Sequence, residues 1–281
     1  MNLILQGLTA PRHIVERIAD LARPREIVAI GEHAYRCMNV SYNDEVKSQI
    51  DMAAWAAQLD YAFIEHERSL ADFKLLTMDM DSTLITIECI DEIADMQGLK
   101  PQVAEITEAA MRGEIEFKES LTRRVALLKG LDAGALQRVY DERLALSPGA
   151  EKMLAGVQAA GIKTLLVSGG FTFFTERMQQ RLALDYTHSN QLEIVDGKLT
   201  GHVIDDIVDG AEKKATVERV CKALHISPQQ AIVMGDGAND LQMMGIAGMS
   251  VAFRAKPIVR AQADIALNFV GLDGILNLFR S

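Results

Sequence analysis

The chain has 281 residues, of which 49% are hydrophobic and 24% charged, so it is long enough for about two domains and is not a largely disordered chain. Its 29 basic and 39 acidic side chains give a net charge of −10, which disfavours binding to nucleic acid or to an anionic membrane surface. An anionic small substrate would therefore need a local cation, either a metal ion or a few Lys and Arg side chains.

The sequence predicts neither a signal peptide nor a membrane-spanning segment. The N-terminus MNLILQGLTAPRH lacks the basic start and long apolar segment of a signal peptide. No uncharged run reaches the roughly 18 apolar residues that span a bilayer. The cysteines Cys37, Cys89 and Cys221 are scattered and form no CxxC motif, so neither a disulfide framework nor a zinc site is expected. We therefore expect a cytoplasmic protein.

Residues 1–70 are predicted to form a small ferredoxin-like module with the element order βαββαβ. Strands are expected at residues 2–6, 26–30, 35–40 and 59–64. Pro11 opens a helix whose apolar side is Ile14, Ile18 and Leu21, and Asn43 can cap a second helix. The charged stretch 66–74 is interpreted as a linker.

Residues 71–281 are predicted to form an α/β domain with a Rossmann-like parallel sheet. Short apolar strands at 75–79, 163–167, 231–234 and 250–253 alternate with helical segments, which is typical of an open parallel sheet. The sequence DGKL (196–199) is a hairpin turn. Within this domain, residues 88–146 are helical at 3.6-residue spacing. We interpret them as a helical cap inserted into a core of residues 71–87 and 147–281.

Three polar clusters come directly after three of these strands: MDMDST (78–83), SGGF (168–171) and GDGANDL (235–241). Alone, each is weak, because DxD is often a turn, SGG a tight turn and GDG a loop. The carboxyl ends of parallel strands, however, form one rim of a sheet, where ligands bind. We therefore expect the three clusters to meet in one site.

The residue types in these clusters suit phosphoryl transfer. Asp79 and Asp81 are separated by one residue, so an extended backbone would point them the same way. Together with Asp236 and Asp240 they form an oxygen-only set that needs a cation and suits Mg²⁺ rather than zinc.

The remaining polar groups suit an anion. Ser168 offers a hydroxyl, and Gly169 and Gly170 offer backbone N–H groups where a helix begins. Lys213 and Lys214 each offer a cation. Positioning and charge neutralisation by such groups provide most of the catalysis in phosphoryl transfer.

The motifs DMDST, SGGF and GDGAND resemble the three motifs of the haloacid dehalogenase superfamily of phosphatases. The segments IECIDEIA (87–94), FKESLTRRVALLKG (117–130) and AKPIV (255–259) extend the resemblance to its phosphoserine phosphatase branch, over about residues 75–270. The resemblance implies Mg²⁺-dependent hydrolysis of O-phospho-L-serine to L-serine and phosphate through an aspartyl phosphate, as the final step of serine biosynthesis.

The resemblance also implies catalytic roles. Asp79 is expected to be the nucleophile and Asp81 the general acid and base. Mg²⁺ would be held by the carboxylates of Asp79 and Asp236 and by the backbone carbonyl of Asp81, with Asp240 behind these ligands.

The expected substrate contacts follow the three charged groups of phosphoserine. The phosphate is assigned to Ser168, Gly169, Lys213 and Asn239, the ammonium to Glu88, the carboxylate to Arg124, and exclusion of water to the cap residues Met111 and Phe117. Lys214 stays an alternative to Lys213. Phe117 begins an apolar helix stripe, so a role in the cap's core stays an alternative for it.

The N-terminal order resembles the regulatory amino-acid-binding domains attached to such phosphatases. We hypothesise that residues 1–70 bind an amino acid or mediate formation of a homodimer. Two other functions stay open: a phosphatase or phosphotransferase of the same superfamily acting on another alcohol such as homoserine, and a phospho-accepting signalling module. Asp81 and a cap large enough to enclose a substrate favour an enzyme over the signalling module.

Overall fold

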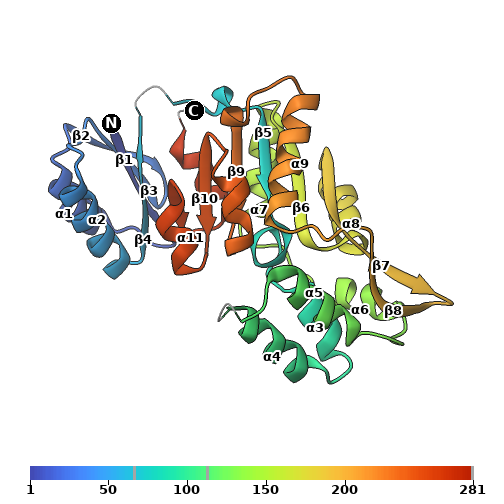
Figure 1. Ribbon diagram of the computed structural model, residues 1–281. Coiled ribbons are helices and arrows are strands. Elements are labelled where there is room, and N and C mark those ends of the chain that lie inside the picture. The colour runs from blue at the N-terminus through green and yellow to red at the C-terminus, as the bar shows by residue number, and fades with distance from the viewer. Residues whose placement is uncertain (66–67, 112–113, 280–281) are drawn as a thin grey trace.

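The computed structural model describes residues 1–65, 68–111 and 114–279, without the side chain of Met111. Figure 1 shows a small N-terminal module, a central sheet flanked by helices, and a group of helices at one end of that sheet. This α/β architecture with a helical insertion and a separate N-terminal sheet is the predicted fold class. In the described part of the chain, no helix is both long and apolar enough to cross a membrane.

The N-terminal module has the predicted βαββαβ order. Its antiparallel sheet has the strand order β2-β3-β1-β4. Its elements are β1 (Asn2–Gly7), α1 (Arg12–Ala19), β2 (Glu26–Gly31), β3 (Ala34–Met38), α2 (Asp44–Ala56) and β4 (Leu59–Ile64). The side chain of Asn43 caps α2 by accepting the N–H of Val46 at 2.8 Å, as predicted.

Two details of the module differ from the prediction. Helix α1 ends at Ala19 and the chain tightens into a 3₁₀ turn, η1 (Asp20–Ala22), so Leu21 turns outward and is 38% exposed. Val15 takes its place in the core beside Ile18. Strand β3 ends two residues early because Asn39 adopts a left-handed conformation, φ 53°.

The central sheet has the strand order β11-β10-β9-β5-β6-β7-β8, with every neighbouring pair parallel except β7 and β8. Its strands are β5 (Leu75–Met78), β6 (Lys163–Phe171), β7 (Tyr186–Val195), β8 (Lys198–Ile204), β9 (Ala231–Gly235), β10 (Met249–Phe253) and β11 (Ile265–Leu267). The chain leaves β5 toward β6 on one side and later returns to β9 on the other. The carboxyl end of β5 is thus the topological switch point, where open α/β sheets bind ligands.

Helices cover both faces of this sheet because its buried strands are apolar on both sides. On β5, Leu76 and Met78 belong to a cluster that includes α7 (Ala150–Ala159), α8 (Thr172–Leu182) and η6 (Leu272–Leu278). Leu75 belongs to the opposite cluster. That second layer comprises α9 (Gly210–Ala223), α10 (Leu241–Met244) and α11 (Pro257–Gln262). The short 3₁₀ turns η4 (Pro228–Gln230) and η5 (Ala238–Asp240) contact α9.

The cap lies beyond the carboxyl end of the sheet (Figure 1) and contains α3 (Cys89–Asp95), α4 (Lys100–Met111), α5 (Phe117–Ala126) and α6 (Gly134–Glu142). The chain enters and leaves it through an antiparallel bridge between Ile85 and Leu146. The β7–β8 hairpin turns at Asp196 and Gly197, with φ of 50° and 73°, at the predicted DGKL turn.

The module is docked on the core rather than tethered to it. Ile4, Ala62 and Ile64 belong to the same apolar cluster as the central sheet. Of the predicted linker, residues 66–67 lie outside the described residues. The part that follows is not a solvated linker, because Phe73 is 1% exposed and packs edge-on against Phe279, ring centroids 5.6 Å apart.

Candidate active site

The chain turns sharply at the end of β5, in the segment that carries the first polar cluster. Asp79 is extended, and from Met80 to Leu84 the backbone winds into a wide turn in which Ser82 has φ of 56°. Asp79 and Asp81 are each extended, with φ/ψ of −70°/160° and −64°/134°, but the turn begins at Met80 between them, so simple strand alternation does not set the direction of the two side chains. The turn closes because the N–H groups of Leu84 and Ile85 donate back to the carbonyls of Asp79 and Met80.

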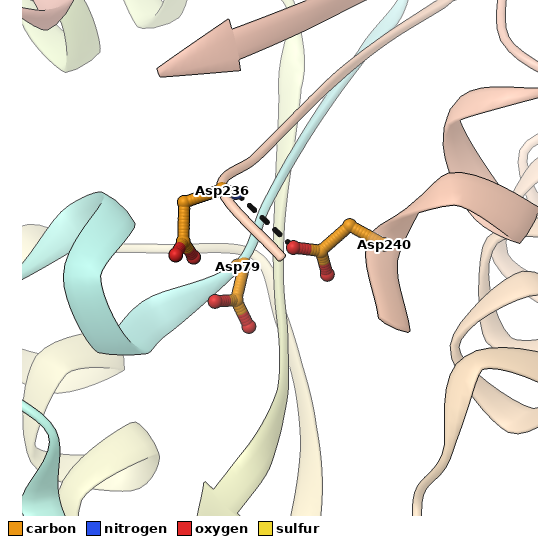
Figure 2. A group of neighbouring side chains, drawn as sticks. All are labelled: Asp79, Asp236 and Asp240. Atoms are coloured by element: carbon orange, nitrogen blue, oxygen red, sulfur yellow. Dashed lines mark hydrogen bonds between the residues drawn. The ribbon is translucent and has the colours of Figure 1, made fainter. Parts of the chain in front are cut away.

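Three carboxylates converge at the switch point. Oxygens of Asp79, Asp236 and Asp240 all lie within 4.8 Å of one another. Figure 2 shows Asp79 and Asp236 arriving from neighbouring strand ends and Asp240 reaching in from the following turn. The convergence of the first and third clusters is as predicted, since β5 and β9 are adjacent parallel strands.

Lys213 supplies a positive charge inside this group. Its Nζ lies 2.5 Å from Oδ1 of Asp79 and 2.8 Å from Oδ1 of Asp240, and its side chain is fully buried. Lys214, the sequence alternative, is 40% exposed and lies 4.0 Å from Glu218 on its own helix. The structure thus brings Lys213, and not Lys214, to the carboxylates.

Asp240 is fully occupied by this arrangement. Besides the Lys213 contact, its Oδ2 accepts the N–H groups of Asp236 and Gly237 at 3.2 and 3.1 Å. The first of these bonds is drawn in Figure 2. Asp240 therefore shapes the loop, leaving Asp79 and Asp236 as the carboxylates free to turn toward a cation.

The charges of the group do not balance. Burial, and then the neighbouring carboxylates of Asp240, Asp236 and Asp81, raise the pKa of Asp79, while the Lys213 ammonium opposes that rise. Burial followed by Asp240 raises the pKa of Asp236 to about 6, against the opposing charges of Lys256 and Lys213. Three carboxylates against one ammonium leave an excess of negative charge that one divalent cation would neutralise. An oxygen-only donor set suits a hard cation.

Asp81 faces the second cluster. Its Oδ1 accepts the N–H of Cys89 at 2.8 Å, and its Oδ2 accepts the Ser168 hydroxyl at 3.3 Å. Burial raises the pKa of Asp81, opposed by those donors. A carboxyl group with a raised pKa at this place can both donate and accept a proton.

The second cluster forms the last residues of β6, whereas it was expected directly after the strand. Ser168 is fully buried, and its Oγ accepts the N–H of Gly170 at 2.8 Å. A Cβ on Gly170 would stand 2.5 Å from Oδ2 of Asp81, and one on Gly169 would stand 2.9 Å from Cζ of Phe117. Glycine is thus required where the cap's aromatic ring and the Asp81 carboxylate approach the strand.

The predicted pair Glu88 and Arg124 lies between cap and core. Glu88 keeps exposed surface as a residue, but loss of hydration at its carboxyl, and then the charge of Asp81, raise its pKa to about 7; it accepts the Ser82 hydroxyl at 2.6 Å. Burial lowers the pKa of Arg124, and Asp91, Glu88 and Asp81 oppose that shift. The guanidinium therefore lies within electrostatic range of these three carboxylates.

The other predicted contacts are less directly placed. A Cβ on Gly237 would stand only 2.3 Å from Oδ1 of Asn239. The Asn239 side chain therefore packs against the loop that carries the third cluster. Met111 has a side chain outside the described residues.

Sequence reasoning missed several contributors. The Thr83 hydroxyl donates to Oδ1 of Asp236 at 3.3 Å, although Thr83 stands in the motif DMDST. Cys89 is a buried free thiol, and its backbone N–H donates to Asp81. Oδ1 of Asp91 is buried and has no hydrogen-bond partner among the described residues, and Asp91 is the first of the carboxylates that oppose the lowering of the Arg124 pKa. The Cys89 contact could not be recognised from residue type, because it is made by a backbone N–H.

Known proteins match both the sequence and the fold. The model of the haloacid dehalogenase-like hydrolases matches residues 73–248. A Polaromonas phosphoserine phosphatase is 58% identical over 216 residues, covering 75% of this chain and 92% of the relative. A Salmonella enterica hydrolase of this family has a TM-score of 0.89 at 32% identity, covering 100% of this chain and 98% of its own.

A further solved structure captures a reaction state. It is a phospho-aspartyl intermediate analogue of phosphoserine phosphatase, with a TM-score of 0.70 at 37% identity, covering 74% of this chain and 99% of its own. The family match and these relatives together show that the chain belongs to the haloacid dehalogenase-like hydrolases.

Proposed function

We propose that the chain hydrolyses O-phospho-L-serine to L-serine and phosphate, the final step of serine biosynthesis, through an aspartyl phosphate, an acyl phosphate formed on Asp79. The observation that carries this proposal is the buried carboxylate of Asp79, held 2.5 Å from the Lys213 ammonium at the switch point of the sheet. The phosphoserine phosphatases among the relatives support the substrate.

In the proposed reaction, a carboxylate oxygen of Asp79 attacks phosphorus and the bond to the serine oxygen breaks. Asp81 protonates that departing oxygen. Asp81 then takes a proton from the water that attacks the aspartyl phosphate, which frees phosphate and restores Asp79. Ser168, Gly169 and Lys213 hold the phosphate oxygens, with Asn239 beside them.

We propose that Mg²⁺ is the cofactor, held by the carboxylates of Asp79 and Asp236 and the backbone carbonyl of Asp81. The oxygen-only donors and the excess negative charge fit a hard divalent cation. When bound, the ion neutralises phosphate charge and so lowers the barrier to attack by a carboxylate.

Substrate choice is assigned to the cap side of the site. Glu88 pairs with the ammonium of phosphoserine, Arg124 with its carboxylate, and Met111 and Phe117 exclude water. An aryl phosphate lacks both of these charges, so Glu88 and Arg124 distinguish phosphoserine from generic phosphate esters. Phosphohomoserine carries the same two charges and differs by one methylene.

The N-terminal module is proposed to bind an amino acid or to form a homodimer. A groove of about 1120 Å³, lined among others by Trp55, Tyr61 and Arg260, lies between the module and the core. Titration with L-serine followed by Trp55 fluorescence, together with sedimentation, tests both alternatives: no fluorescence change and a monomer would reject them.

The three cysteines are buried and unpaired, which suits the reducing cytoplasm that we propose as the compartment.

Phosphate release from L-phosphoserine, with and without Mg²⁺, tests the proposed function. We expect Mg²⁺-dependent release that the substitution Asp79→Asn abolishes. Release from an aryl phosphate but not from phosphoserine would overturn the substrate assignment, and no release from either would overturn the enzyme.

A further inference from the structure

An ion pair joins the cap to the core beside the candidate site. Nζ of Lys118, on α5 of the cap, lies 3.1 Å from Oδ2 of Asp209, the residue before α9 of the core. The Lys118 side chain is 56% exposed and that of Asp209 23%. A pair this accessible to water can break and re-form without disturbing either core.

The core end of the pair is held firmly. Oδ1 of Asp209 accepts the N–H of Glu212 at 2.9 Å and so caps α9. Burial opposes ionisation of Asp209, but the Glu212 N–H and the Lys118 ammonium outweigh it and lower its pKa. One turn further along the same helix, Lys213 reaches Asp79.

The cap end of the pair adjoins Phe117, the residue that covers Gly169 at the end of β6. Lys118 directly follows Phe117, whose Cζ would lie 2.9 Å from a Cβ on Gly169. The two ends of the pair thus stand beside Phe117 on one side of the site and one turn from Lys213 on the other.

The described backbone contacts between cap and core lie elsewhere. One group is the bridge of Ile85 to Leu146, where the chain crosses between the two parts. The other is at the β7–β8 hairpin, where Gly130 donates to the carbonyl of Leu199 at 2.8 Å and Ala133 to that of Gly197 at 2.8 Å. Neither group fixes the N-terminal end of α5 over Gly169.

We propose that Lys118 is a positioning residue whose ion pair with Asp209 holds α5 closed over the site, with Phe117 against Gly169. This inference deepens, and rests on, the proposed phosphatase function. Exposed ion pairs are worth a fraction of a kcal/mol to about one, so loss of the pair is expected to raise KM by about 2- to 5-fold. Because Lys118 does not touch the reacting atoms, kcat should not fall.

A double-mutant cycle of Lys118→Met and Asp209→Asn tests the inference. The asparagine keeps an oxygen that can cap α9, so only the charge is removed. The matched control is Arg123→Met, which removes a cation from the same helix, because Arg123 pairs within α5 with Glu119 at 2.5 Å. KM and kcat are measured for phosphoserine at low and high salt.

We expect the same rise in KM in each single variant and in the double variant, an unchanged kcat, and no change in Arg123→Met. Salt screens binding of the charged substrate in every protein, so KM should rise with salt in all of them, but the rise should be steeper in the wild type, which also loses the ion pair. Additive effects of the two substitutions, or an equal effect of the control, would overturn the pair.

Hydrogen exchange of the α5 amides provides a second readout that needs no turnover. Exchange should be faster in Lys118→Met and Asp209→Asn than in wild type and in Arg123→Met. Unchanged exchange would reject the pair even if the enzyme is active. Faster exchange in a protein that releases no phosphate would instead reject the proposed function and retain the contact.

Discussion

Lys213 places one positive charge among the carboxylates of Asp79, Asp236 and Asp240, and it is fully buried there. Removing one partner of a buried ion pair leaves uncompensated charge and costs about 3 kcal/mol. We predict that Lys213→Met lowers the free energy of unfolding of the metal-free protein by about that amount and abolishes turnover.

Urea unfolding in the presence of a chelator measures the Lys213 effect. Lys214→Met is the matched control, because Lys214 is 40% exposed, and it should change the free energy of unfolding by less than about 0.5 kcal/mol. Equal losses in the two variants would contradict the assignment of Lys213.

Glu88 gives the reaction a predicted pH dependence. Its pKa is raised to about 7, so below that pH the carboxyl is protonated and cannot pair with the substrate ammonium. We predict that KM for phosphoserine is about tenfold higher one pH unit below that pKa than well above it. Steady-state kinetics from pH 6 to pH 8 check this.

Two comparisons isolate Glu88 from the titration of the phosphate group. Glu88→Gln should have a high KM that varies little over this pH range. An aryl phosphate, which has no ammonium, should show no rise in KM at low pH with either protein. A rise in KM for phosphoserine at low pH that persists in Glu88→Gln would assign the titration to another group.

At the scale of elements, the end of β6 is built to bring Ser168 and Asp81 together. A Cβ on Gly170 would stand 2.5 Å from Oδ2 of Asp81 and 3.0 Å from Oγ of Ser168. We predict that Gly170→Ala displaces the acid–base carboxylate and lowers kcat by about 100-fold, the scale of general acid–base catalysis. The measurement is kcat at saturating phosphoserine.

Gly31→Ala serves as the control for Gly170, since its added Cβ would come within only 3.7 Å of Ala34. It should leave kcat unchanged. An unchanged kcat in Gly170→Ala would mean that the carboxylate of Asp81 does not need its observed place.

The strands were predictable from the sequence because fully buried parallel strands read as short apolar runs, as in Leu75–Met78 and Ala231–Gly235. Convergence of the first and third clusters followed from strand adjacency. The winding of Met80–Leu84 was not predictable from alternation, since it depends on backbone hydrogen bonds that no residue type marks. The ion pair of Lys118 and Asp209 joins helices 91 residues apart in sequence and carried no local pattern.

At the scale of the whole molecule, Asp60 ties the N-terminal module to the core. It is 1% exposed and accepts four hydrogen bonds: the N–H groups of Asn268, Phe269 and Val270 and the Asn268 side-chain amide. Burial raises the pKa of Asp60 and these donors oppose the shift. The module is therefore part of one folded unit with the phosphatase core.

We predict that Asp60→Asn lowers the free energy of unfolding by about 2 kcal/mol, because its amide group turns a donor toward backbone donors. Asp44→Asn, at an exposed position in the same module, is the control and should change it by less than about 0.5 kcal/mol. Urea unfolding followed by Trp55 fluorescence and by activity should give one shared transition. Loss of the module's signal before activity would contradict a single folded unit.

The central claim is that Asp79 itself carries the phosphate during turnover. The most direct measurement is acid quenching of the enzyme during hydrolysis of phosphate-labelled phosphoserine, followed by borohydride reduction and sequencing of the peptide that contains both Asp79 and Asp81. The account predicts label before reduction and a homoserine at position 79 after it, with neither in Asp79→Asn. Turnover without any covalent label, or a homoserine at position 81 instead, would contradict it.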